Sequence, residues 1–119
     1  MQMTQTMNFY DEACDKYDQS FYYFIIHAFN SLPLVCIVNE SYFCVHGGIT
    51  TLAESIQELN KMNRFVEVPM SGSLCDLVWS DPVQDDTGST HSQNPLIPNY
   101  QRNCSIFFGA DHARNFLKR

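Results

Sequence analysis

A histidine stands at the end of a short apolar run in the segment YFCVHGG, residues 42–48. The run is typical of a strand, and the two glycines remove side chains at the point where regular backbone ends. His46 is therefore expected to be exposed at the mouth of a strand, in a position suited to chemistry. A histidine can also simply end a strand, and this local setting alone favours a structural role.

The elements around His46 can be predicted from the neighbouring residues. Two β-favouring runs, 34–38 and 42–45, are separated by the polar residues NES and predict a hairpin. After the glycines, residues 51–62 have the spacing of an amphipathic helix, capped by Thr50 or Thr51. Its expected apolar side is formed by Leu52, Ile56 and Leu59.

The N-terminal third of the chain predicts two helices. The first covers residues 9–17, with Asn8 as its cap, and the second covers residues 18–32 and is stopped by Pro33. The second helix has apolar residues at helical spacing, which are Phe21, Phe24, Ile25, Ala28 and Phe29. These side chains are expected to form core, or a surface that further parts of a domain would cover.

The rest of the chain predicts fewer regular elements. Residues 63–99 are expected to be mostly irregular, with a short helical turn at 74–79. A strand is predicted at 104–109 and a helix at 110–119, with Ala110, Ala113, Phe116 and Leu117 facing inward. The fold class is therefore α/β or α+β, without a central sheet of its own.

Charge and composition narrow the function class. The chain has 119 residues, of which 45% are hydrophobic, and its 7 basic and 13 acidic residues give a net charge of −6. No basic patch is visible that could replace counterions on a phosphate backbone, which argues against nucleic-acid binding. An acidic surface instead favours basic partners such as Lys/Arg-rich peptides.

The five cysteines are widely spaced and lie within apolar runs. They are expected to be free thiols in a reducing compartment. The N-terminus has neither the basic nor the apolar region of a signal peptide, and the longest apolar run is too short to span a bilayer. These features predict a soluble intracellular protein with no membrane partner.

Four strings of the chain resemble the PPP-type protein serine/threonine phosphatases, the calcineurin and type 1/2A group. They are TQTMNFYDEACDKY at 4–17, LPLVCIVNESYFCVHGG at 32–48, NRFVEVPMSGSLCDLVWSDP at 63–82 and QRNCSIFFGADHARNFL at 101–117. They occur in the family's order and cover nearly the whole chain. The resemblance leaves open whether the calcineurin branch or the type 1/2A branches are nearer.

The resemblance implies roles for particular residues. His46 falls on a histidine that ligates one of two active-site metal ions, for which Mn, Fe or Zn would suit. Arg102 falls on an arginine that holds the substrate phosphate, a catalytic and substrate-binding role. Asp81, Asp85 and Asp86 fall in a loop beside the active site and could favour basic peptide substrates. Asn103 stands where the family has glycine, and asparagine tolerates unusual backbone angles.

The resemblance also implies a fold, partners and a location. Residues 1–119 would be the middle-to-late portion of a catalytic domain of the metallophosphoesterase α+β sandwich type, present only in part. The partners would be phosphoprotein substrates and regulatory subunits, in the cytoplasm or the nucleus. The family's other ligand motifs, GDxHG, GDxVDRG, GNHE and a late RAH, do not occur in the sequence. The chain alone is therefore expected to be inactive, since one histidine cannot assemble a two-metal site.

Other interpretations stay open at this point. The chain could be a non-catalytic phosphatase remnant that acts by binding partners, or a small metal module built on His46, His91 and His112. Otherwise His91 and His112 are expected to face solvent, and His27 to be a hydrogen-bonded core or boundary residue. Trp79 is expected to be a packing anchor.

Overall fold

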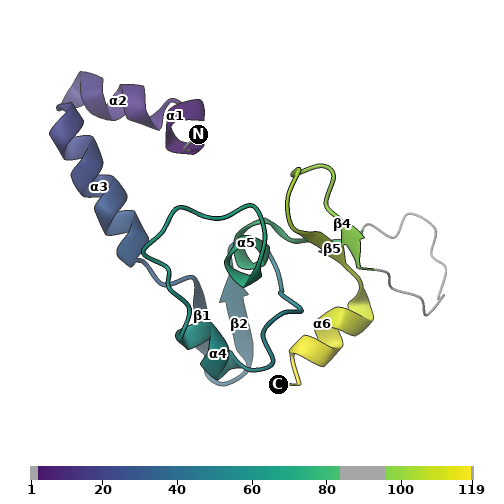
Figure 1. Ribbon diagram of the computed structural model, residues 1–119. Coiled ribbons are helices and arrows are strands. Elements are labelled where there is room, and N and C mark those ends of the chain that lie inside the picture. The colour runs from purple at the N-terminus through teal and green to yellow at the C-terminus, as the bar shows by residue number, and fades with distance from the viewer. Residues whose placement is uncertain (1–2, 84–95, 119) are drawn as a thin grey trace. The chain divides into compact units, whose positions relative to one another are not determined.

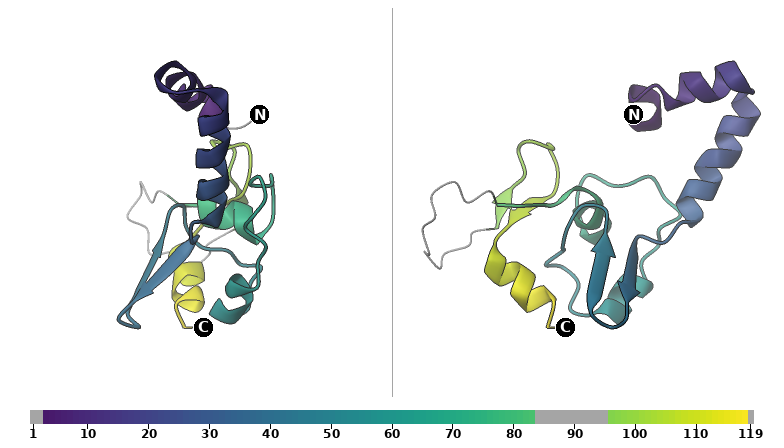
Figure 2. Two further views of the ribbon diagram at one scale, coloured as in Figure 1. Left: turned by 90° about the vertical axis from the view of Figure 1, so that its left-hand side faces the viewer. Right: turned by 180° about the vertical axis from the view of Figure 1, so that it is seen from behind.

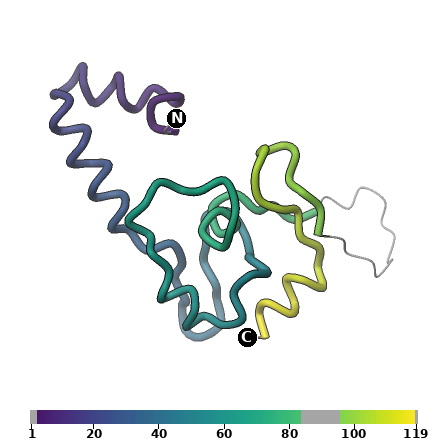
Figure 3. Tube along the Cα trace, viewed as in Figure 1, coloured from purple at the N-terminus to yellow at the C-terminus, as the bar shows by residue number. Residues whose placement is uncertain are grey.

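The structure is a computed structural model that describes residues 3–83 and 96–118. Helices and short strands are both present, and the chain divides into two compact units (Figure 1). One unit comprises Met1–Pro33 with Arg64–Glu67, and the other comprises Leu34–Asn63 with Val68–Arg119. Figure 3 shows the path of the chain through both. No helix in the described part is long and apolar enough to cross a membrane.

Three helices form the first unit: α1 (Met3–Thr6), α2 (Phe9–Lys16) and α3 (Gln19–Ser31). The two longer helices confirm the prediction, and α3 is capped by Asp18, whose carboxylate accepts the Phe21 N–H at 2.8 Å. The predicted side-chain cap at Asn8 is wrong. Asn8 has a left-handed backbone, with φ 64°, and its side chain makes no capping hydrogen bond.

A tyrosine, rather than the predicted apolar stripe, anchors α3 in this unit. Tyr22 is fully buried, packs against the rings of Phe9 and Tyr10, and its hydroxyl lies 2.9 Å from Thr4 Oγ1. Phe24, at the centre of the stripe, is 74% exposed. The stripe therefore has helical spacing but mostly faces away from the packed side of α3 within this unit.

The second unit contains the predicted hairpin. Strand β1 (Val35–Val38) pairs antiparallel with β2 (Tyr42–Val45), as the rear view in Figure 2 shows. The turn passes through Asn39 and Glu40, whose φ angles of 50° and 51° are left-handed. The Ser41 N–H donates to the Val38 carbonyl at 3.1 Å and closes the turn. The hairpin ends one residue before His46.

A second sheet contains three very short strands in the order β3-β5-β4. Strand β5 (Ile106–Phe108) lies inside the predicted strand, pairs parallel with β3 (Asp81–Pro82) and antiparallel with β4 (Ile97–Pro98). The prediction of irregular structure missed β3 and β4. Each has two residues and includes a proline, so no alternating pattern could reveal it.

Three short helices complete this unit: α4 (Ile56–Asn60), α5 (Ser73–Trp79) and α6 (Ala110–Phe116). The helix predicted over residues 51–62 is wrong in its first turn. It begins after Ser55, whose hydroxyl accepts the Glu58 N–H, and Leu52 is 64% exposed. The core consists of Ile49, Ala53, Leu59, Leu77 and Phe116.

Helix α6 confirms the predicted C-terminal helix only in part. Phe116 is buried in the core and Ala113 packs against it. Ala110 is exposed and Leu117, just beyond the helix, is 67% exposed, so these two do not face inward. The inward face is therefore narrower than the sequence pattern suggested.

Candidate functional site

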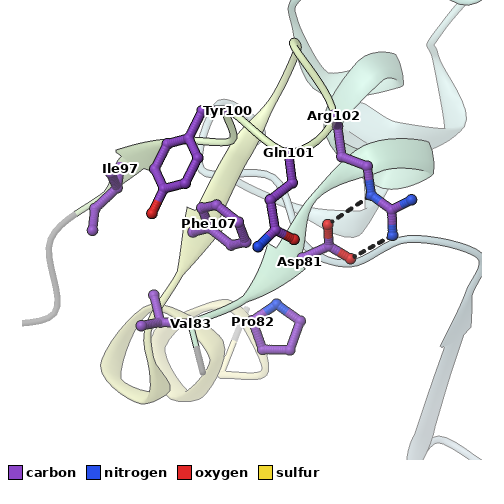
Figure 4. A pocket seen from close by; sticks show the side chains of 8 residues that line it. All are labelled: Asp81, Pro82, Val83, Ile97, Tyr100, Gln101, Arg102 and Phe107. Atoms are coloured by element: carbon purple, nitrogen blue, oxygen red, sulfur yellow. Dashed lines mark hydrogen bonds and ion pairs between the residues drawn. The ribbon is translucent and has the colours of Figure 1, made fainter. Parts of the chain in front are cut away.

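Two of the residues singled out from the sequence form a two-point ion pair. Arg102, in the turn between β4 and β5, donates from Nε to Asp81 Oδ2 at 3.0 Å and from Nη2 to Asp81 Oδ1 at 3.3 Å (Figure 4). The guanidinium fork fits the carboxylate edge, so both side chains are fixed in orientation. The Arg102 hydrogen bond holds the pKa of Asp81 below its ordinary value, although partial burial opposes this, and the carboxylate raises the pKa of Arg102.

Asn99 holds this pair in place, and sequence reasoning missed it. Its side chain is 2% exposed. Its Nδ2 donates to Asp81 Oδ2 at 2.8 Å and to the Trp79 carbonyl at 3.2 Å, while its Oδ1 accepts the Arg102 backbone N–H at 3.2 Å. One buried amide therefore connects the start of β3 with the turn that carries Arg102.

The turn after Arg102 has an unusual backbone. Asn103 has φ 56°, which confirms that asparagine supplies the left-handed conformation at the position where the resembling family has glycine. Ser105 has φ 62°, and its carbonyl accepts the Asn99 N–H at 3.0 Å. On the other side, the Trp79 ring lies 5.9 Å from Arg102 Cζ and is half-buried, so it contacts the cation as well as packing.

A pocket of about 500 Å³ opens beside the ion pair. It is lined by Asp81, Pro82, Val83, Ile97, Tyr100, Gln101, Arg102 and Phe107. Figure 4 shows the Tyr100 ring and the Gln101 amide among the side chains that line it with the ion pair, and the Gln101 amide points toward Asp81. The pocket therefore combines a charged wall with apolar and aromatic walls. Such a surface suits a ligand that has an anionic group on an organic side chain.

His46 is exposed directly after β2, as its sequence predicts. The next residue, Gly47, donates its N–H to the Leu77 carbonyl at 2.9 Å. A Cβ on Gly47 would lie 2.5 Å from the Val78 carbonyl carbon, and one on Gly48 would meet the Phe108 ring. The glycine pair therefore lets the backbone behind the imidazole pass against the end of α5.

The structure does not bring His46 into the pocket. It is absent from the residues that line the cavity, and no contact found among the described residues joins it to the Arg102–Asp81 pair. Within residues 3–83 and 96–118, no three His, Cys, Asp or Glu side chains gather as metal ligands. His46 suits a metal as one imidazole donor, but these residues do not supply the donors of a two-metal site.

Three other histidine predictions have different outcomes. His27 is exposed on α3, so its expected core or boundary position is wrong. His112 is half-buried on α6 and its Nδ1 has no partner among the described atoms, so it does not face solvent as expected. His91 lies outside the described residues, as do Asp85 and Asp86, so the proposed triple-histidine metal module has two described members.

The buried cysteine of α5 is not an activated nucleophile. All five are free thiols. Cys75 is fully buried in α5, and burial, with the neighbouring Cys104 thiol, raises its pKa to about 12. Its thiol therefore stays protonated at neutral pH, whereas a nucleophilic cysteine needs a lowered pKa.

Comparison with known proteins gives a consistent family match. A family model described as calcineurin-like phosphoesterase matches residues 7–119. The chain is 39% identical over 122 residues to the serine/threonine-protein phosphatase 2B catalytic subunit A1 of Saccharomyces cerevisiae, covering 98% of this chain and 22% of that protein. It is 40% identical over 117 residues to the serine/threonine-protein phosphatase 4 catalytic subunit of Kluyveromyces lactis, covering 98% and 35%.

A solved structure shows the same similarity in three dimensions. It is a protein serine/threonine phosphatase from Saccharomyces cerevisiae with similarity to human phosphatase PP5. The TM-score is 0.77 at 28% sequence identity, covering 96% of this chain and 34% of that chain. The chain thus spans between about a fifth and a third of the length of these relatives.

Proposed function

The chain belongs to the calcineurin-like phosphoesterase family and has its α/β metallophosphoesterase fold, and we propose that it is the middle-to-late portion of a protein serine/threonine phosphatase domain. Its relatives are serine/threonine-protein phosphatases 2B and 4. The reaction of the complete domain would be metal-dependent hydrolysis of phosphoserine or phosphothreonine. Phosphoprotein substrates, regulatory subunits and a cytoplasmic or nuclear location are part of this proposal.

The geometry of Arg102 carries the proposal. Asp81 uses the Nε–H and one Nη2–H, and a guanidinium has five N–H donors, so three donors stay available at the edge of the pocket. Because Asp81 fixes the guanidinium, and Asn99 holds both Asp81 and the Arg102 backbone, Arg102 would bind a phosphate group with little further loss of conformational entropy. Asp81 would then act mainly by orienting Arg102, since its charge is already compensated by the guanidinium.

His46 is the proposed metal ligand of this chain. Its exposed imidazole, placed by the β2 end and the glycine pair, can donate a neutral ring nitrogen to Mn, Fe or Zn. In the complete domain two such metal ions, when bound, would polarise the phosphoryl group and activate water as the nucleophile. The described residues supply one ligand, and we therefore propose that this chain alone does not catalyse the reaction.

A second candidate function is a non-catalytic interaction protein. The observation that favours it is the exposed aromatic side of α3, where Phe24 and Tyr23 face outward within their unit. Aromatic side chains exposed together commonly mark a surface that binds another protein. Under this alternative, phosphate need not bind at Arg102.

A phosphate titration tests the first proposal. Binding of inorganic phosphate or a phosphoserine peptide to the complete 119-residue chain would be measured by isothermal titration calorimetry in each variant, and in the wild-type chain the Nε–H resonance of Arg102 would also be followed by NMR. We expect Arg102→Lys to weaken phosphate binding by roughly tenfold, because it removes the planar fork that makes charge-assisted hydrogen bonds. Arg114→Lys is the matched control, since Arg114 is an exposed arginine paired with Asp111 on α6.

Two results would count against the proposal. Equal weakening by the two lysine variants would indicate general charge attraction, and the absence of any phosphate response at Arg102 would remove its proposed role. Hydrolysis of the phosphopeptide in the presence of Mn²⁺, lost in Arg102→Lys, would instead show that the chain is active without further ligands.

A further inference from the structure

A buried carboxylate connects the segment behind His46 with the turn behind Arg102. Asp76, in the first turn of α5, is 4% exposed. Its Oδ2 accepts a hydrogen bond from the Thr50 hydroxyl at 2.9 Å, and its Oδ1 accepts one from the Ser105 hydroxyl at 2.8 Å. Both carboxylate oxygens are thus used by side chains far from Asp76 in the sequence.

The two donors lie close to the two candidate site residues along the chain. Thr50 follows His46 by four positions, and Ser105 follows Arg102 by three. The residues between His46 and Thr50 have little room to move. Ile49 is buried, and its carbonyl accepts the Ser80 hydroxyl at 3.0 Å. A displacement of Thr50 would therefore be transmitted toward His46.

The Ser105 side of the connection is also constrained. Ser105 has a left-handed backbone, an unfavourable conformation for a residue with a side chain. Its hydroxyl bond to Asp76 and its carbonyl bond to the Asn99 N–H both support that conformation. Since Asn99 in turn binds the Arg102 backbone, a change at Ser105 would reach the guanidinium.

Removing Asp76 would leave two hydroxyl donors without their acceptor in a closely packed region. Buried polar groups that lose their partner are costly, so the surrounding backbone would rearrange rather than keep both hydroxyls in place. The sequence gives no sign of this role for Asp76, because neither of its contacts is local and the pattern at Thr50 predicts a helix cap.

We infer that Asp76 is a positioning residue that ties the placement of His46 to the placement of Arg102. This inference rests on the proposed function, because it concerns the two residues that would hold metal and phosphate. Asp76 touches neither ligand. Its buried carboxylate instead fixes, through Thr50 and Ser105, the two backbone segments that carry His46 and Arg102.

The test is whether removing a hydroxyl group near His46 changes the NMR signals of Arg102, and whether removing one near Arg102 changes those of His46. In the complete chain, Thr50→Val removes the hydroxyl beside His46, and Ser105→Ala removes the one beside Arg102. We expect Thr50→Val to shift the Arg102 Nε–H resonance and to weaken inorganic phosphate binding roughly twofold or more, as coupled contacts do. We expect Ser105→Ala to shift the His46 ring resonances and their broadening by Mn²⁺.

Controls separate this coupling from a general loss of structure. Thr51→Val makes the same chemical change one position along and should leave Arg102 unaffected. Thr50→Ser retains a hydroxyl and should restore the wild-type Arg102 resonance. In Asp76→Asn the effects of Thr50→Val on Arg102 and of Ser105→Ala on His46 should be lost, with circular dichroism recording whether each variant is folded.

The inference is overturned if each hydroxyl variant perturbs only its own side, or if Thr51→Val acts on Arg102 as Thr50→Val does. Should Asp76→Asn not fold, the Thr50 and Ser105 variants still decide, because they leave the carboxylate in place. Failure of the proposed function has a different appearance. Phosphate would then leave Arg102 unchanged in the wild-type chain, while the resonance shifts between the two sides would still be present.

Discussion

At the scale of single residues, the ion pair between Asp81 and Arg102 is the best-defined feature of the site. The two side chains come from residues that are 21 positions apart, yet they meet through two hydrogen bonds. The pair is only partly shielded from water, so its importance is orientation rather than stability. Under the proposed function, an arginine whose guanidinium is already fixed would bind an anionic ligand with little further ordering.

The pair predicts a pH dependence with a definite sign. The folded state lowers the pKa of Asp81 below its ordinary value of 3.8, so the unfolded chain binds the proton more readily. The contribution is fully present above that ordinary value and is lost as the pH falls through the lower folded pKa. We therefore expect the stability loss between pH 5 and pH 2 to be smaller in Arg102→Ala than in wild type, measured as urea unfolding midpoints.

The matched control for this pH series is Arg114→Ala, which removes the exposed partner of Asp111. That variant should follow the wild-type curve closely, since its pair is more exposed than the Asp81 pair. If the acid-side curves of wild type and Arg102→Ala coincide, Arg102 does not lower the pKa of Asp81, and the pair does not form in solution.

The sequence revealed the charged residues of the site but not the polar residues that hold them. Arg102, Asp81 and His46 stand in recognisable strings, so their types and positions could be noticed. Asn99 stands outside those strings, and Asp76 stands inside one without any local sign of its role, because the importance of both comes from hydrogen bonds to residues between 18 and 29 positions away. Buried polar contacts of this kind depend on tertiary structure and leave no local pattern.

At the scale of secondary-structure elements, the contact between the glycine pair after β2 and the end of α5 determines the position of His46. Gly47 approaches the backbone of Val78 and Trp79 more closely than a residue with a Cβ could. Its N–H bond to Leu77 fixes the same contact. The sequence signal, two glycines after a strand, was informative because it reports this close approach.

Gly47→Ala should therefore destabilise the chain by about 1–3 kcal/mol, the usual cost of overpacking. The added Cβ would lie 2.5 Å from the Val78 carbonyl carbon and 2.7 Å from the Trp79 nitrogen, backbone atoms that cannot rotate away. Urea unfolding measures the loss, and the His46 ring resonances should shift as well. Gln57→Ala, on the exposed side of α4, is the control and should change little. Equal unfolding midpoints for Gly47→Ala and wild type would mean that the two backbones are farther apart.

Helix boundaries show where local patterns misled. Residues 50–53 have the composition of a helix start, but Thr50 donates its hydroxyl to Asp76 and accepts the Leu52 N–H, which makes a turn. The helix begins only where Ser55 and Glu58 supply a cap. The hairpin and α3 were predicted correctly, because their tertiary contacts favour the same structures as their local sequences. The first turn of the helix predicted over residues 51–62 did not form, because the buried Asp76 carboxylate binds the Thr50 hydroxyl that was expected to cap it.

At the scale of the whole molecule, the two units differ in how much core they bury. The second unit has a cluster of five buried residues with further apolar side chains packed against it. Among the described residues of the first unit, the buried side chains are those of Ala13 and Tyr22. Many aromatic side chains of the first unit therefore stay at its surface, including those of Tyr17, Tyr23 and Phe24.

This difference predicts that the 119-residue chain binds the dye ANS while folded and associates at high concentration. Exposed aromatic groups on one helix provide apolar surface for both processes. Phe24→Ser removes the most exposed aromatic side chain of α3, so it should lower ANS fluorescence and the concentration dependence of sedimentation. The free energy of unfolding should change little, because Phe24 is 74% exposed.

Tyr22→Ser is the contrasting variant, since loss of a fully buried ring should reduce the helical circular dichroism signal. If the wild-type chain stays monomeric at high concentration and does not increase ANS fluorescence, this aromatic surface is covered. That result would also remove the observation that favours a role in binding another protein.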